Sequence, residues 1–102
     1  VIPGGERWKD NSLRVAIEDW LGAGAIIAEM EGNLSAEALL ARSVYETAAG
    51  QMEHFVLESI SGRELITRGR IQDVELALEI NISSCAPLLK DRAFTDGANI
   101  LY

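Results

Sequence analysis

Apolar residues recur every three or four positions through the first third of the chain. The recurring positions are Leu13, Ile17, Trp20, Gly24, Ile27 and Met30. This is the period of a buried stripe along an α-helix. We therefore expect a helix that is capped at Asn11 or Ser12 and runs to about Glu31, where Gly32-Asn33 closes it. Its inward side chains should be Ile17, Trp20, Ile27 and Met30.

The pattern stays mainly helical after this segment. Ser35 is the predicted cap of a second long helix that reaches about Glu58, with Gly50 as a weak point in its middle. Ser61 and Glu64 have the spacing of a capping box, which predicts a short helix that stops at Gly69.

A further helix fits residues 71–79, and the pattern then changes. The stretch from Ala86 to Phe94, with a turn-like Lys90-Asp91-Arg92, indicates a short hairpin or a terminal strand, and residues 95–99 indicate a loop. At the other end, Val1-Ile2 before Pro3-Gly4-Gly5 is typical of a strand that enters a turn. We therefore expect a piece of a longer protein.

Composition excludes several classes of protein. A chain of 102 residues that is 48% apolar and 25% charged fits one globular domain. Its net charge of −7 repels nucleic-acid phosphate and anionic lipid, so neither is an expected partner. The longest apolar run, Trp20–Ala28, is too short to cross a membrane. A single cysteine, Cys85, fits a reducing, cytoplasmic compartment and is expected to be buried.

Two neighbouring carboxylates stand out on the predicted first helix. Asp19 lies at the edge of the apolar face, where a carboxylate is costly unless it is paired or bound to a metal ion, and Glu18 precedes it. Arg14 and Glu18 have the spacing of an ordinary surface pair. Zinc is not expected, because His54 and Cys85 are the one histidine and the one cysteine. Taken alone, these residues favour structural pairing over metal binding.

The segment from Ser61 to Asp73 holds the densest group of basic residues. Gly62 would let a ligand approach the start of a helix, and Arg63 could donate two hydrogen bonds to a phosphate, sulfonate or carboxylate. An ordinary capping box with exposed arginines explains the same residues equally well.

Several strings, taken in order, resemble the second half of the 2-phosphosulfolactate phosphatase family. They are Pro3–Trp8, Ser12–Arg14, Glu18–Ile27, Ser61–Leu65, Gly69, Asp73–Ala77 and Pro87. The resemblance covers residues 1–95, which would form the C-terminal half of such a domain, with 96–102 as a tail. It implies an α/β fold of which this helix-rich piece, with a short strand at each end, is a fragment.

The resemblance also implies a function. The family hydrolyses the phosphate ester of 2-phosphosulfolactate to sulfolactate, requires Mg²⁺ and belongs to coenzyme M biosynthesis. On this basis Glu6, Glu18 and Asp19 become candidate metal ligands, with Glu18 and Asp19 also catalytic. Arg14, Gly62 and Arg63 become candidate sites for the substrate's anionic groups.

The expected protein is thus a cytoplasmic, homo-oligomeric phosphoric monoester hydrolase that acts on a small anionic phosphate ester. Because the family's other half would supply part of the site, residues 1–102 alone are expected to be inactive. The alternative function is a non-catalytic helical module for dimerisation or docking, whose acidic residues are merely solvated.

Overall fold

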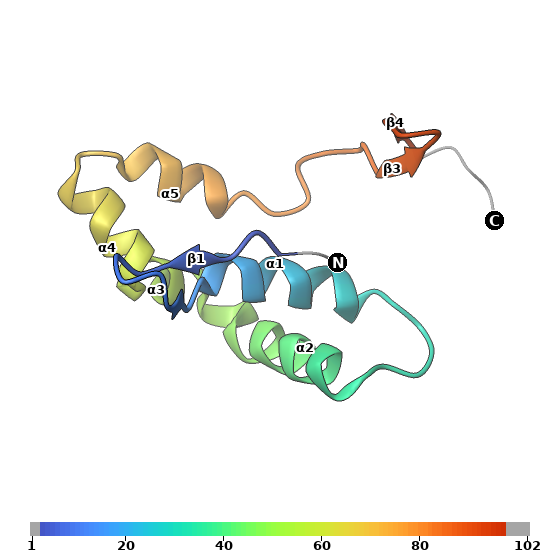
Figure 1. Cartoon of the computed structure of the whole chain (residues 1–102), viewed down its shortest axis with the longest axis horizontal. Helices are drawn as coiled ribbons and strands as arrows, with labels where there is room; N and C mark the ends of the chain where they lie inside the picture. Colours follow the sequence, from blue (N-terminus) through green and yellow to red (C-terminus); the bar gives the residue numbers. More distant parts are fainter. Residues whose placement is uncertain (1–2, 98–102) are drawn as a thin grey trace.

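The structure is a computed structural model that describes residues 3–97. A hairpin of β1 (Glu6–Arg7) and β2 (Leu13–Arg14) precedes the helix α1 (Ile17–Ala28). The chain returns along α2 (Ala36–Ala48), so that α1 and α2 form a helical hairpin (Figure 1). The predicted Val1-Ile2 strand lies outside the described residues.

Shorter helices follow. The 3₁₀ turn η1 (Ala49–Gln51) leads into α3 (Met52–Glu58), and α4 (Ile60–Thr67) and α5 (Ile71–Ala77) come next. The antiparallel strands β3 (Pro87–Lys90) and β4 (Ala93–Asp96) form a second hairpin that stands away from the helices (Figure 1). The result is an α/β arrangement, as predicted, but the β1–β2 hairpin lies where the sequence indicated a turn and a helix cap. No helix within residues 3–97 is long and apolar enough to span a bilayer.

The predicted start of the first helix is wrong. The Asp10 carboxylate accepts hydrogen bonds from the Ser12 backbone N–H and hydroxyl, and Asn11 adopts a φ of 70°, so these residues build the β1–β2 turn. This local turn competes with helix formation. Helix α1 begins only at Ile17, after Ala16, whose side chain makes no cap hydrogen bond.

The second predicted helix is confirmed at its start and divided in its middle. The Ser35 hydroxyl accepts a hydrogen bond from the Ala38 N–H, as the cap prediction requires. The helix tightens into η1 around Gly50, and Gln51 leaves helical geometry before α3 begins. Gly50 is therefore the weak point that the sequence indicated.

The contact between α1 and α2 defines the small core. Ala16, Leu21, Ile27, Ala48 and Val74 are its buried apolar residues. Gly24 permits the close approach of the two helices, because a Cβ at this position would collide with the Ala41 carbonyl oxygen and lie 2.6 Å from the Tyr45 Cβ.

The predicted inward set is correct for Ile27 and wrong for Trp20 and Met30, which are each 52% exposed. Leu21, Gly24 and Ile27 are the buried residues of α1, whereas Trp20 lies at the edge of the α1–α2 contact, in open hollows that it shares with Leu40 and Val44 of α2. The predicted burial of Cys85 is also wrong, because its side chain is exposed on the segment before β3.

The C-terminal prediction is largely confirmed. Asp91 and Arg92, both at positive φ, form the turn between β3 and β4. The predicted loop at 95–99 is wrong for Thr95 and Asp96, which pair with β3. Residues 98 and 99 lie outside the described part of the chain.

Candidate functional site

The β1–β2 hairpin places Arg14 against α4. The Arg14 side chain is only 9% exposed. Its Nη1 donates to Glu64 Oε1 at 3.3 Å and its Nη2 to Glu64 Oε2 at 3.2 Å, with a further bond from Nη2 to Ser61 Oγ at 3.0 Å. Arg14 Nε is buried and has no hydrogen-bond partner in the structure described. The guanidinium is therefore held in one orientation by α4.

One hairpin residue, Trp8, contacts this guanidinium, and others stabilise the turn. The Trp8 ring lies 5.1 Å from Arg14 Cζ, within the range of a cation–π contact. Arg7 Nη1 donates to the Asn11 carbonyl oxygen at 2.7 Å and so steadies the turn. The hydrogen bond from the Ser12 hydroxyl lowers the pKa of Asp10, which keeps that carboxylate charged.

An open cleft of about 660 Å³ lies between this hairpin and α4. We call it the hairpin cleft, and it is lined by Arg7, Trp8, Lys9, Asp10, Arg14, Glu64 and Arg68. Four of these residues are basic and two are acidic, in a chain whose net charge is −7. The cleft can therefore attract a small anion that the rest of the surface repels.

The predicted anion site at Gly62 and Arg63 has a different local structure. Ser59, not Ser61, caps α4, since its Oγ accepts the Gly62 N–H at 2.9 Å. The predicted capping box is therefore wrong. The N-cap lies two positions earlier than predicted, and the Ser61 hydroxyl oxygen accepts a hydrogen bond from Arg14. The absence of a side chain at Gly62 serves close packing, as a Cβ there would collide with the Val56 carbonyl oxygen.

Arg63 is exposed and forms an ion pair with Glu58, whose pKa is lowered by the hydrogen bond from Arg63. Arg63 lines a shallow hollow beside the hairpin cleft, together with Ile60, Glu64, Thr67 and Arg68. The hollow and the cleft share Glu64 and Arg68. Arg14 and Arg63 thus belong to two adjoining depressions along α4.

The predicted metal ligands do not form one cluster. Asp19 Oδ2 accepts a hydrogen bond of 2.5 Å from the Gly5 N–H, which places this carboxylate beside the start of the hairpin. Glu6 follows Gly5 and pairs with Arg14 in the strand register. Within residues 3–97, no group of three or more His, Cys, Asp or Glu side chains could hold a metal ion. The predicted set does not fit a three-carboxylate Mg²⁺ site.

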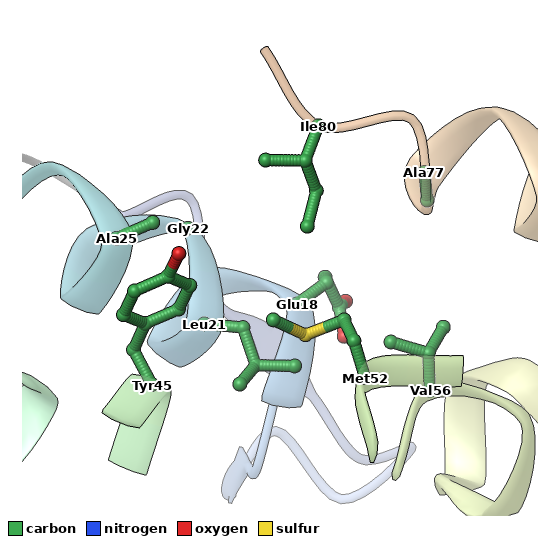
Figure 2. Close-up of a pocket in the computed structure, with 9 residues that line it drawn as sticks. All are labelled: Glu18, Leu21, Gly22, Ala25, Tyr45, Met52, Val56, Ala77 and Ile80. Atoms are coloured by element: carbon green, nitrogen blue, oxygen red, sulfur yellow. The ribbon is translucent and has the colours of Figure 1, made fainter. Parts of the chain in front are cut away.

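Glu18 lies in different surroundings from Asp19. Figure 2 shows it at the edge of a small, partly open cavity of about 130 Å³ that is lined by residues of α1, α2 and α3, by the end of α5 and by Ile80 beyond it. Glu18 is the one charged residue in a lining that otherwise includes Leu21, Met52, Val56 and Ile80. An apolar cavity of this size is unsuited to a phosphate dianion.

The comparison with known families adds an independent finding. A family described as 2-phosphosulpholactate phosphatase matches residues 9–92, which is most of the chain. The chain belongs to this family. Searches of curated proteins and of solved structures find no significant match.

Within this 2-phosphosulfolactate phosphatase family segment, sequence reasoning missed Lys9, Glu64 and Arg68 as residues of the cleft. The basic group from Arg63 to Arg70 is visible in the sequence, but no sequence pattern indicates that residues 7–10 lie across the cleft from it. Only the packing of the β1–β2 hairpin on α4 brings residues 7–10 to face residues 64–68.

Proposed function

We propose that this chain contributes to a Mg²⁺-dependent phosphatase that hydrolyses 2-phosphosulfolactate, or a related small acidic phosphate ester, to the alcohol and phosphate. The observation that carries the proposal is the family match over residues 9–92. It is supported by the hairpin cleft, which concentrates basic side chains in an acidic protein.

Hydrolysis of a phosphate monoester requires groups that hold a dianion and stabilise the charge of the transition state. In this proposal Arg14 and Arg63 serve that purpose from the two adjoining depressions along α4. Arg14 is already oriented by Glu64, whereas Arg63 must exchange its partner Glu58 for the substrate. Gly62 acts indirectly, by allowing α4 to begin close to Val56.

Of the two candidate catalytic carboxylates, Asp19 has the catalytic role and Glu18 does not. Asp19 is held by the Gly5 N–H beside the hairpin, whereas Glu18 lies at the apolar cavity. Mg²⁺ is a hard cation that binds through few carboxylates and retains water, and in this proposal Asp19 contributes one of those carboxylates.

The test compares two variants of the protein in its full natural length. Asp19→Asn should lower turnover of 2-phosphosulfolactate about a hundredfold or more, the usual contribution of a catalytic carboxylate. Glu18→Gln, at the adjacent position on α1, is the matched control and should keep turnover within about threefold. Both variants are assayed during a Mg²⁺ titration. Unchanged turnover in Asp19→Asn would contradict the assignment, and absence of any turnover in the unaltered protein would contradict the function.

A non-catalytic docking module is the second candidate, and one observation favours it. Leu13 and Val15, on either side of the buried Arg14, are 77% and 61% exposed. A contiguous apolar patch, of which these two side chains would form part, is typical of a contact surface. This candidate would be supported by two results together. The full-length protein would hydrolyse none of the phosphate esters tested, and sedimentation experiments would show self-association that Leu13→Ser abolishes. The homo-oligomeric state and the cytoplasmic location stay predictions.

A further inference from the structure

The cavity beside Glu18 is separate from the hairpin cleft, because the two linings have no residue in common. Small residues of α1 leave this space open. Gly22 has no side chain, Ala25 has only a methyl group, and a Cβ at Gly22 would meet no atom within 4 Å. The rest of the lining is apolar apart from the Tyr45 hydroxyl and the Glu18 carboxylate. The cavity is therefore a space that the proposed phosphatase chemistry does not use.

The size and the lining of the cavity fit one small ring. Its volume is about 130 Å³, and in another protein an apolar cavity of about 150 Å³ binds benzene. The Met52 thioether and the Tyr45 ring both line the space (Figure 2). Both groups make favourable contacts with an aromatic ring. An apolar group of this size would thus displace water from the cavity and contact side chains of α2 and α3.

Glu18 adds one negative charge to this apolar space. Within residues 3–97 its carboxylate forms no ion pair, whereas the neighbouring Asp19 carboxylate is held by the Gly5 N–H. Glu18 is also exposed, so a cation could pair with it at the mouth of the cavity without being buried. Pairing at the mouth avoids the desolvation cost of a buried ion pair. The same carboxylate repels an anionic ligand, and so does the net charge of −7.

We propose that this cavity binds a primary amine, in its ammonium form, that carries one apolar group of about the size of a benzene ring. The apolar group occupies the space lined by Leu21, Met52 and Ile80, and the ammonium pairs with Glu18 at the mouth. The inference is independent of the proposed function, because the ligand is a cation and its site shares no residue with the hairpin cleft.

The first experiment compares three probes that share one ring and differ in charge. Benzylammonium, benzyl alcohol and phenylacetate are titrated into the full-length protein, and NMR follows the methyl signals of Met52, Val56 and Ile80, which line the cavity. Benzylammonium should shift these signals along a saturating curve and bind about fivefold more tightly than benzyl alcohol, as an exposed ion pair allows. Phenylacetate should bind more weakly than benzyl alcohol. Unshifted methyl signals, or an affinity for benzylammonium no higher than for the other two probes, would overturn the proposal.

The second experiment removes the charge and the space separately. Glu18→Gln should weaken benzylammonium binding about fivefold and leave benzyl alcohol binding within about twofold. Gly22→Leu places a side chain in the cavity and should weaken the binding of both probes about tenfold or more. Leucine favours a helix more than glycine does, so this variant should keep the fold, which urea unfolding checks. Unchanged benzylammonium binding in folded Gly22→Leu would place the probe elsewhere and refute the site.

The matched control is Glu31→Gln, which removes an exposed carboxylate from the segment between α1 and α2, outside the cavity lining. It changes the net charge by the same amount as Glu18→Gln and should leave benzylammonium binding unchanged. An equal loss in the two variants would show that net charge alone attracts the probe, which is a result against the site. None of these measurements requires turnover, so they remain decisive if the phosphatase function is wrong.

Discussion

Arg14 and Glu64 lie fifty positions apart in the sequence and form a bidentate ion pair, in which Nη1 donates to Oε1 and Nη2 donates to Oε2. The pair joins β2 to the middle of α4. Both residues of the pair also line the hairpin cleft. One contact thus serves both the fold and the candidate site.

Loss of Glu64 should destabilise the folded chain more than loss of an exposed partner. Glu64→Ala leaves the buried Arg14 without its carboxylate and should lower the free energy of unfolding by about 2 kcal/mol. Glu58→Ala removes only the exposed partner of Arg63 and should cost less than about 0.5 kcal/mol. Urea titration of both variants measures the difference. Equal losses would mean that the Arg14 pair contributes no more than a surface pair.

The α1–α2 contact gives a prediction with a control two residues away. Gly24→Ala would drive a methyl group into the Ala41 carbonyl, and it should destabilise the chain by about 2 kcal/mol or more. Gly22→Ala meets no atom within 4 Å and should stabilise α1 by up to about 1 kcal/mol, because alanine favours the helix. Thermal unfolding followed by circular dichroism distinguishes the two. A stabilising Gly24→Ala would contradict the close packing of these helices.

Neighbouring isoleucines on α1 should respond differently to truncation. Ile27 is 9% exposed and Ile26 is 56% exposed. Ile27→Ala should cost about 2–5 kcal/mol through lost burial and the cavity left behind, whereas Ile26→Ala should cost less than about 1 kcal/mol. Chemical denaturation gives both values. A loss below about 0.5 kcal/mol for Ile27→Ala would place that side chain on the surface.

The cap of α4 gives another test. Ser59 Oγ accepts the Gly62 N–H at 2.9 Å and donates to the Val56 carbonyl oxygen at 2.7 Å. Ser59→Ala should therefore cost about 1 kcal/mol, the usual value for a lost N-cap. Ser83→Ala, on the exposed segment before β3, should have little effect on the unfolding midpoint. If both substitutions shift the midpoint equally, Ser59 does not cap the helix.

The Glu58–Arg63 pair predicts a pH effect. The hydrogen bond from Arg63 holds the pKa of Glu58 below its usual value of 4.5. A carboxyl group with a pKa lowered by folding stabilises the folded state above its unfolded pKa, and this contribution disappears as the pH falls through the folded pKa. Arg63→Met should raise the pKa of Glu58 towards 4.5 and remove this contribution.

NMR titration of the side-chain carboxyl carbons measures this shift. Asp10 is the internal control, because its lowered pKa comes from Ser12 and should not change in Arg63→Met. A Glu58 pKa that stays low in the variant would show that Arg63 is not its cause.

Elements that depend on near neighbours could be predicted from the sequence. Ser35 caps its helix, α4 ends before Gly69, and the β3–β4 hairpin turns at Asp91 and Arg92. Each of these depends on hydrogen bonds or backbone preferences within a few residues, so a local pattern is sufficient. The family resemblance was likewise carried by short strings in order, and the match over residues 9–92 confirms it.

Packing between distant segments decided the rest. The apolar period of α1 indicated a buried face, but only the packing of the helices decided that Leu21 is buried and that Trp20 stays half exposed beside α2. Glu18 and Asp19 are adjacent in sequence, yet one lies at an apolar cavity and the other bonds to Gly5. The sequence by itself therefore determined most of the helices, the β3–β4 hairpin and the family, but not the β1–β2 hairpin or the start of α1. The tertiary structure decided which side chains meet, because Arg14 can reach Glu64 only after the hairpin has packed on α4.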